Sequence, residues 1–412
     1  MRVLIISGAF PPVKAGEADH VFHLCHHLVK RGLDVHVLTT TGQSADSHLP
    51  FKVHRRIRNW SWPDLPRVAR SMRELAPDAV LLIYTDWVYK NHLMITFAPI
   101  LAKMLLPNVP FVTQLETEET SLKASLPIRA LLKILRHIDG NQRPHHMATL
   151  LYGSKRIITL SERHKSRLLQ KFPSLNSRSL VIPPSPLLRM CAGSNPNDRC
   201  RRRRDLGIQP TEFLAVYFGY IYAAKGVNTL FEAMRILKDR GRRLRLLIVG
   251  GGVDLSHPSL HVQSLLELAD KLAIDDMISW TGEYATDSDE ASRYLYAADA
   301  CVLPFTSGVT LNRSSFVATA AHGLPIITTR GETLESAFLH RGNVLLCPPK
   351  NPHALALAIE SLMTDPTLVQ QLKLGALRLA SEYFSWDKAV ERTIEALSSN
   401  HDGLGRPAAV DF

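Results

Sequence analysis

The first half of the chain alternates short apolar runs with amphipathic segments. Residues 3–6 form a continuous apolar run, which is typical of a strand buried on both faces of a parallel sheet. After a loop with Pro and Gly, residues 21–29 place Val, Leu and Cys on one helical face, and a second strand is predicted at 35–38. Together these segments predict a β-α-β unit. Further strands are predicted at 79–83, 111–112, 156–159 and 180–182.

The second half repeats this alternation. Apolar runs at 214–218 and 244–249 predict strands, and residues 227–240 predict the helix between them. Shorter strands are predicted at 278–280, 301–303 and 326–328, and residues 354–400 predict helices with breaks near Pro366 and Trp386. We therefore expect an α/β protein with two doubly wound, Rossmann-like domains that face each other across a cleft. Such a cleft is the natural place for a ligand, although the architecture alone names no reaction.

The domain boundaries follow from a change in composition. Residues 183–204 are rich in Pro, Ser, Asn and Arg and have no hydrophobic period, which favours an interdomain connection. The run Arg201–Arg204 is a solvated linker or the start of a helix. We assign residues 1–190 to the first domain, 191–204 to a basic linker and 205–384 to the second domain. Residues 385–400 are expected to be a helix that could cross back to the first domain, and 401–412 a tail.

Composition excludes several classes of protein. With 45% hydrophobic and 21% charged residues, the 412-residue chain is not mostly disordered. Five cysteines without a C-x-x-C pair argue against a disulfide scaffold or a zinc ribbon. The apolar run at the N-terminus is too short for a signal peptide, and Lys103 interrupts the longest candidate for a membrane span. We expect a cytoplasmic protein.

The positive charge is concentrated in one region. The whole chain has a net charge of +11, whereas residues 121–204 hold 18 Lys or Arg against three acids. This local excess favours an anionic partner surface over a nucleic acid. Residues 128–138 within it predict an amphipathic helix that carries Arg129, Lys133 and Arg136. Packing of this helix against the core and docking on anionic lipid are both consistent with the pattern, so we expect peripheral contact with a membrane as one outcome.

Three loops of the second half place small residues and cations at predicted strand ends. Gly lets a backbone approach a ligand closely, and the N-terminus of a helix favours an anion. One loop contains Gly219, Tyr220, Lys225 and Gly226; the next contains Thr310, Asn312, Arg313, Ser314 and Ser315; the third is formed by Gly282, Glu283 and Tyr284. For each loop taken alone, a tight turn with a helix cap is the simpler interpretation. Together, at one edge of a parallel sheet, they favour a phosphate ligand.

At this point the chain resembles the group 1 glycosyltransferases, retaining enzymes of the GT-B fold that use nucleotide sugars. Phe10-Pro11-Pro12 with Ala15-Gly16, and the segment 28–39 (LVKRGLDVHVLT), are similar to the opening motifs of the family. In the second half, the segments at 218–227, 247–250, 280–282 and 323–327 follow the order of the family's motifs. The resemblance covers roughly residues 1–400.

The chain also departs from the family pattern. The register of the E-x7-E motif places Thr310 and Ala318 where the family has acids that contact the donor. The loop around Arg313 resembles a variant branch in which Ser and Arg replace the first acid, and Tyr220 stands in place of an Arg. The T-x-H motif of the first domain is Thr113-Gln114-Leu115 here, so the expected His is missing. The nearby acids Glu116, Glu118 and Glu119 leave a catalytic base unassigned.

The resemblance implies transfer of a sugar from a nucleotide-diphosphate sugar to a glycan or lipid-linked acceptor, as in polysaccharide biosynthesis, with retained anomeric configuration. Lys225 and Arg313 are the expected catalytic cations, which stabilise the leaving diphosphate without a metal or other cofactor, and Gly16 is expected to approach the donor from the first domain. A catalytically inactive binding protein and a sugar-nucleotide epimerase of the same fold remain alternatives.

Two other patterns suggest metals more weakly. Asp287-Ser288-Asp289 matches a D-x-D metal motif, but it precedes a predicted helix, where a cap is the simpler interpretation. Four histidines between His20 and His27 are dense, yet they lack the H-E-x-x-H form of a zinc site. We therefore predict no metal ligands.

Overall fold

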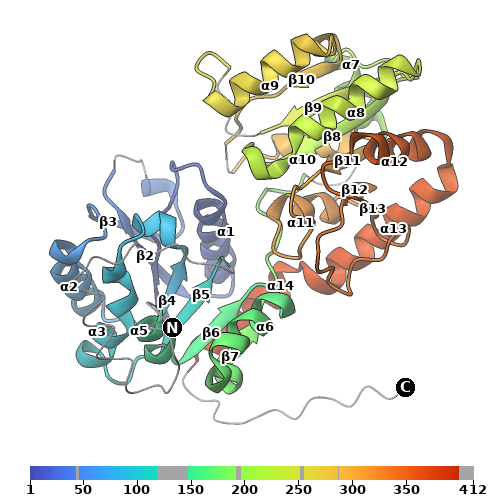
Figure 1. Cartoon of the computed structure of the whole chain (residues 1–412). Coiled ribbons are helices and arrows are strands. Elements are labelled where there is room, and N and C mark those ends of the chain that lie inside the picture. Colours follow the sequence, from blue (N-terminus) through green and yellow to red (C-terminus); the bar gives the residue numbers. More distant parts are fainter. Residues whose placement is uncertain (43–45, 118–146, 192–195, 251–254, 286, 399–412) are drawn as a thin grey trace. The chain divides into compact units, whose positions relative to one another are not determined.

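The computed structural model divides into two units, each built on a parallel sheet. It describes residues 1–42, 46–117, 147–191, 196–250, 255–285 and 287–398. Unit 1 comprises Met1–Ile182 and the residues from Asp387 onward, and unit 2 comprises Pro183–Trp386. Helices flank both sheets (Figure 1).

Unit 1 contains a seven-stranded sheet in the order β3-β2-β1-β4-β5-β6-β7. The strands are β1 (Arg2–Ile6), β2 (Asp34–Thr40), β3 (Lys52–Ile57), β4 (Ala79–Tyr84), β5 (Phe111–Leu115), β6 (Arg156–Thr159) and β7 (Ser179–Val181). The helices are α1 (Gly16–Lys30), α2 (Leu65–Leu75), α3 (Ala98–Leu105), α5 (Ala148–Gly153), α6 (Glu162–Lys171) and α14 (Trp386–Leu397). The strand order reverses direction between β1 and β4.

Unit 2 contains a six-stranded sheet in the order β10-β9-β8-β11-β12-β13. The strands are β8 (Phe213–Phe218), β9 (Leu244–Val249), β10 (Ile278–Trp280), β11 (Ala300–Leu303), β12 (Ile326–Thr329) and β13 (Leu345–Cys347). The helices are α7 (Pro196–Asp205), α8 (Val227–Asp239), α9 (Leu260–Lys271), α10 (Glu290–Ala297), α11 (Ser314–Ala321), α12 (Pro352–Thr364) and α13 (Pro366–Tyr383). Here the order reverses between β8 and β11.

The apolar runs of the sequence form the centres of both sheets. All six residues of β4 are buried, as a strand covered on both faces must be. The predicted strands and the predicted breaks near Pro366 and Trp386 are confirmed. The sequence pattern missed β3 and β13. The sequence of β3, KVHRRI, has no apolar run, which fits a strand that pairs only with β2 and stays half-buried.

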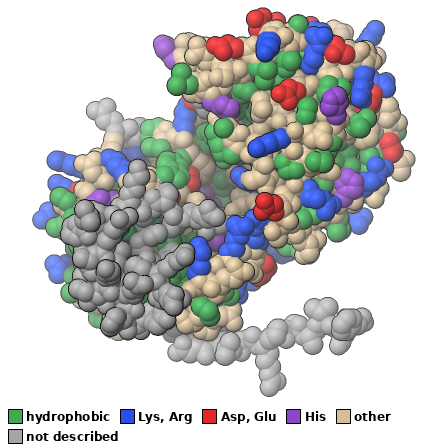
Figure 2. All heavy atoms as spheres, viewed as in Figure 1, with side chains coloured by type: hydrophobic (Ala, Val, Ile, Leu, Met, Phe, Trp, Pro, Cys, Tyr) green, Lys and Arg blue, Asp and Glu red, His purple; other side chains and the backbone are tan. Residues whose placement is uncertain are grey.

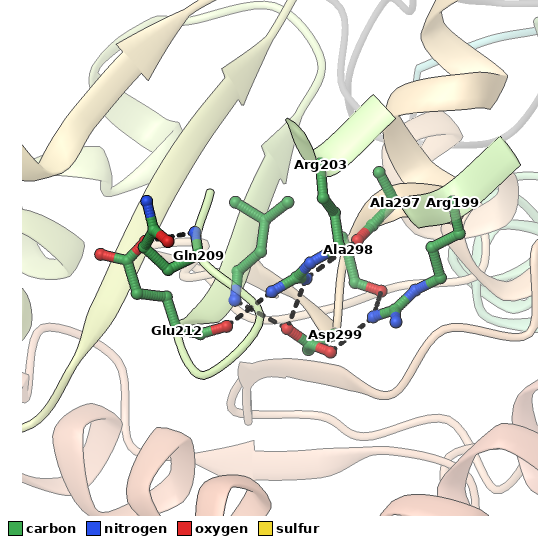
Figure 3. Close-up of polar contacts among 8 residues, drawn as sticks. Arg199, Arg203, Gln209, Glu212, Ala297, Ala298 and Asp299 are labelled. Atoms are coloured by element: carbon green, nitrogen blue, oxygen red, sulfur yellow. Dashed lines mark hydrogen bonds and ion pairs between the residues drawn. The ribbon is translucent and has the colours of Figure 1, made fainter. Parts of the chain in front are cut away.

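The segment predicted as a basic linker is partly helical. Helix α7 covers residues 196–204 of it, ends at Asp205 and belongs to unit 2. Arg199 and Arg203 both pair with Asp299, at 2.6 and 3.0 Å, and Arg203 also donates to the carbonyls of Ala297 and Glu212 (Figure 3). With its side chain only 9% exposed, Arg203 is part of the packing of unit 2. The arginine run is thus in part a structural anchor, which a solvated linker would not provide.

The basic region is described only in part. Residues 128–138, with Arg129, Lys133 and Arg136, lie outside the described residues, so the predicted amphipathic helix stays a prediction. On the face of unit 2 that Figure 2 shows, Lys and Arg side chains alternate with Asp and Glu. Among the described residues, no helix combines the length and hydropathy needed to cross a bilayer.

Candidate functional site

The loops after β8 and β11 meet at the point where the strand order of unit 2 reverses. In open parallel sheets this point, at the carboxyl ends of the strands, is where ligands bind. Gly226 makes the contact possible: its φ is +68°, and a Cβ there would lie 2.1 Å from the carbonyl oxygen of Pro304. The backbone N–H of Thr306 donates to the carbonyl of Ala224 at 3.1 Å, which ties the two loops together. A side chain at position 226 would therefore separate them.

Lys225 is buried in this contact, and no acidic side chain among the described residues pairs with it. It ends the 3-10 helix η6 (Ala223–Lys225) and is 7% exposed. Its Nζ lies 5.2 Å from the ring centre of Tyr222 and 5.0 Å from that of Phe305. Burial, and then the charge of Arg313, lower the pKa of Lys225 from 10.5 to about 7. An anionic ligand would reverse this effect by stabilising the ammonium form.

Arg313 approaches the same aromatic ring from the loop after β11. Its guanidinium lies 4.8 Å from the ring centre of Phe305, and Nη2 donates to Ser307 Oγ at 3.0 Å. Nε of Arg313 and Oγ of Ser315 are both buried and make no hydrogen bond within the described part of the chain. Two cations thus face one aromatic ring, and Arg313 Nε and Ser315 Oγ can still donate hydrogen bonds. This arrangement is suited to an anion.

Helix α11 begins at these cations. Arg313 is its N-cap residue and provides no side-chain cap, so the first N–H groups of the helix have no cap from that side chain. Gly219, at the end of β8, lies so close that a Cβ there would be 3.1 Å from Cβ of Ser315. Lys225, Arg313, Ser314 and Ser315 therefore surround the N-terminus of α11, where the helix dipole also favours negative charge.

The other residues predicted to bind the donor lie in the loops after β8, β11 and β10. Thr310 Oγ1 donates to Asn312 Oδ1, which orders the loop before α11. The carbonyl of Tyr220 accepts a hydrogen bond from the hydroxyl of Tyr217 at 2.8 Å. Gly282, Glu283 and Tyr284 follow β10, which is two strands away from β8.

Tyr284 connects this third loop to the end of β8. Its ring stacks on Phe218 with centres 6.4 Å apart and leaves no room for a side chain at Gly250, where a Cβ would be 2.8 Å away. Gly16 is the first residue of α1 in unit 1. Sequence reasoning missed Phe305, because it follows an apolar strand and has no signal of its own.

A second group of ionisable side chains lies at the corresponding edge of unit 1. Gln114 Nε2 lies 2.8 Å from His20 Nε2 and donates to Glu116 Oε1 at 2.6 Å. The indole N–H of Trp87 donates to Glu17 at 3.2 Å. Leu115 stands at the position of the missing His, is 2% exposed and packs in the core. The next residue, Glu116, belongs to the cluster through its hydrogen bond with Gln114. Glu118 and Glu119 lie outside the described residues.

The two patterns that suggested metals have structural explanations. Asp289 pairs with Arg293 one turn along α10, and Ser288 Oγ accepts the N–H of Glu290, as at a helix start. Of the histidines on α1, His20 and His23 are buried, and burial lowers the pKa of each, to about 4 and about 3. Within the described ranges, no three His, Cys, Asp or Glu residues lie close enough together to bind a metal.

Family models match both halves of the chain. Residues 15–185 match the model described as Glycosyltransferase Family 4, and residues 212–365 match that of Glycosyl transferases group 1. An uncharacterised glycosyltransferase of Methanocaldococcus jannaschii is 21% identical over 98% of this chain and 100% of its own length. A D-inositol 3-phosphate glycosyltransferase of Streptomyces bingchenggensis is 30% identical over 52% of this chain, which corresponds to 46% of that protein.

Solved structures share the fold over nearly the whole chain. The sucrose-phosphate synthase of Thermosynechococcus elongatus matches with a TM-score of 0.71 and 18% identity over 96% of this chain and 97% of its own. Anabaena HepE, solved with UDP and glucose, matches with a TM-score of 0.72 and 17% identity over 97% of this chain and all of its own. At this identity the likeness establishes the fold.

Proposed function

The chain belongs to the group 1 glycosyltransferases and has their GT-B fold, and we propose that it transfers a sugar from a nucleotide-diphosphate sugar to a glycan or lipid-linked acceptor. The approach of both Lys225 and Arg313 to the ring of Phe305, at 5.0 and 4.8 Å from its centre, is the observation that supports this proposal. Both cations lie at the N-terminus of α11, at the reversal point of the sheet in unit 2.

The chemistry needs positive charge at this place. Transfer breaks the bond between the anomeric carbon and the diphosphate oxygen, which leaves with the bonding electrons, and forms a bond from the acceptor oxygen to that carbon. Stabilising the leaving charge is the largest single demand on such a site. Lys225, Arg313 and the first N–H groups of α11 supply three kinds of donor for it, so we propose that transfer proceeds without a metal.

The choice of donor and the stereochemistry rest on the relatives. HepE was solved with UDP-glucose in one of its structures, which makes UDP sugars the first donors to test. Retention of the anomeric configuration is proposed from the family alone. The relatives do not identify the acceptor. The match to the D-inositol 3-phosphate glycosyltransferases covers only about half of the length of those proteins.

A donor screen tests this proposal. Thermal shift with UDP-, GDP-, ADP- and TDP-sugars, each with and without EDTA, is expected to select one nucleotide, and EDTA should leave the shift unchanged. Intact-mass detection of product and NMR of its anomeric proton then give the reaction and its stereochemistry. Binding of a donor with epimerisation and no transfer would favour the epimerase, and binding without any turnover the inactive protein, which Thr310 and Ala318 suggest. No stabilisation by any donor would refute the proposal.

Contact with an anionic membrane is proposed separately, from the net charge of +15 over residues 121–204. Each Lys or Arg near an anionic leaflet contributes about 1 kcal/mol, so attachment should be reversible and sensitive to salt. Flotation with anionic liposomes at low and high salt tests it, and absence of binding at low salt would contradict it.

A further inference from the structure

The carboxyl edge of the sheet in unit 1 gathers side chains that no part of the donor chemistry uses. At the reversal between β1 and β4, Glu17 and His20 of helix α1 contact Trp87 and Gln114, respectively. Trp87 follows β4 in the 3-10 helix η3 (Asp86–Tyr89), and Glu116 follows β5. In open parallel sheets, ligands bind where the strand order reverses, so we expect a ligand at this place in unit 1 as at the corresponding place in unit 2.

The cluster combines a buried Gln114, which contacts two of its members, with an exposed indole. Gln114 is 3% exposed, and it contacts His20 and Glu116 at 2.8 and 2.6 Å. Trp87 is 49% exposed although its indole N–H is fixed on Glu17. A flat apolar face is thus presented to solvent beside two carboxylates, which is a common arrangement for holding a sugar ring.

A buried hydroxyl completes the cluster. Thr85 is fully buried directly after β4, and it lies close enough to Glu17 to favour the ionised carboxyl. Its Oγ1 nevertheless makes no hydrogen bond of normal geometry within the described residues. The Thr85 hydroxyl therefore acts on the cluster through Glu17, whose ionised form it favours.

The charge of the cluster limits what can bind. Burial raises the pKa of Glu116 to about 7, and burial followed by the charge of Glu116 raises the pKa of Glu17. Burial lowers the pKa of His20 to about 4, so it is neutral at pH 7. No Lys or Arg among the described residues contributes to the pKa shift of either carboxyl. Such a site repels a phosphate and accepts hydrogen bonds from hydroxyl groups.

We infer that Glu17, Glu116 and Trp87 bind the acceptor, and that this acceptor presents an uncharged, hydroxyl-bearing sugar ring. The inference rests on the proposed glycosyltransferase function and adds the substrate class of its second site. The carboxylates accept hydrogen bonds from ring hydroxyls, and the indole contacts the apolar face of the ring. The phosphorylated inositol named for the relatives is the kind of acceptor that this site excludes.

Ligand binding to the full chain tests this inference without a donor. Saturation-transfer NMR at pH 7.5 compares matched pairs: methyl glucoside with glucose 6-phosphate, and inositol with inositol 3-phosphate, with glucosamine as a cationic probe. The uncharged member of each pair is expected to bind at least tenfold more tightly. Preference for the phosphorylated members or for glucosamine, or no binding of any uncharged sugar, would overturn the inference.

Variants locate the site. Glu116→Gln, Glu17→Gln and Trp87→Ala should each weaken binding of the preferred sugar at least tenfold while leaving the thermal shift by the donor unchanged. Glu162→Gln, an acid at the start of α6, and Trp62→Ala, another exposed indole of unit 1, are the matched controls and should bind normally. Equal affinity of site variants and controls would refute the assignment. If the wild-type chain bound no nucleotide sugar, that result would contradict the proposed function. The binding of free sugars could still be measured, so the two failures can be distinguished.

Discussion

The two units have the same kind of parallel sheet but carry opposite charge where their strand order reverses. In unit 2 the reversal between β8 and β11 holds Lys225 and Arg313 close to the ring of Phe305. In unit 1 the reversal between β1 and β4 holds Glu17 and Glu116 beside Trp87. Both places combine an aromatic ring with two like charges.

The difference indicates how one topology could suit the two ligands that we propose. The sheet provides the same feature twice, an edge where loops diverge and backbone groups are exposed. In each unit burial acts against the charged state: it lowers the pKa of Lys225 to about 7 and raises that of Glu116 to about 7. Burial therefore makes the charged state of each free site unfavourable. We propose that an anion in unit 2 and a hydroxyl-rich ring in unit 1 stabilise these charged states.

Removing a cation from unit 2 should have the largest effect. Lys225→Ala and Arg313→Ala are each expected to lower kcat/KM by roughly 100-fold or more, because each removes one preorganised contact to the leaving diphosphate. Steady-state kinetics with the donor that the screen selects gives the ratio. Arg293→Ala, which removes an exposed Arg from α10, is the control and should leave kcat/KM unchanged. Near-normal turnover of both site variants would place the diphosphate elsewhere.

Removing the charge from unit 1 should stabilise the free protein. The pKa of Glu116 is raised on folding from 4.5 to about 7, so the folded state holds a proton that the unfolded state releases, and stability is lost as the pH rises from about 4.5 to about 7. Glu116→Gln, which keeps the oxygen that accepts from Gln114, is expected to raise the free energy of unfolding by about 1–3 kcal/mol at pH 8.

Chemical denaturation at two pH values checks this prediction. At pH 5 the carboxyl of Glu116 is already neutral in the folded state, so the variant and the wild type should differ little. Glu162→Gln should show no such dependence on pH. A variant that is less stable than the wild type at pH 8 would mean that the charged carboxylate is favourable where it lies.

Titration of Lys225 should give the smallest effect. Because the pKa of Lys225 is about 7 in the free protein, the ammonium form that an anion needs is fully present only below that pH. The affinity for the donor is expected to fall about tenfold between pH 7 and pH 8.5, with uptake of protons on binding. Calorimetry in two buffers of different ionisation enthalpy measures both. Lys225→Arg keeps its charge over this range and should flatten the profile; a flat profile in the wild type would contradict the prediction.

Local patterns in the sequence determined most of the fold and the donor loops. Strands such as β4 and β8 are buried on both faces, so their apolar runs are continuous and visible in the sequence. The cations follow those strands within a few residues, and in a parallel sheet all carboxyl ends lie at one edge. That Lys225 and Arg313 are near each other could therefore be predicted, whereas the ring of Phe305 that both approach could not.

Only the tertiary structure decided the acidic cluster of unit 1 and the role of the arginine run. Trp87 and Glu17 are 70 residues apart in the chain, Gln114 and His20 are 94 apart, and Arg203 and Asp299 are 96 apart. A lone Glu or Arg has the same local pattern whether it is solvated or buried against a distant partner. Contacts of α1 with Trp87 and Gln114, and of α7 with Asp299 before β11, bring these groups together, and burial then sets their pKa and their chemistry.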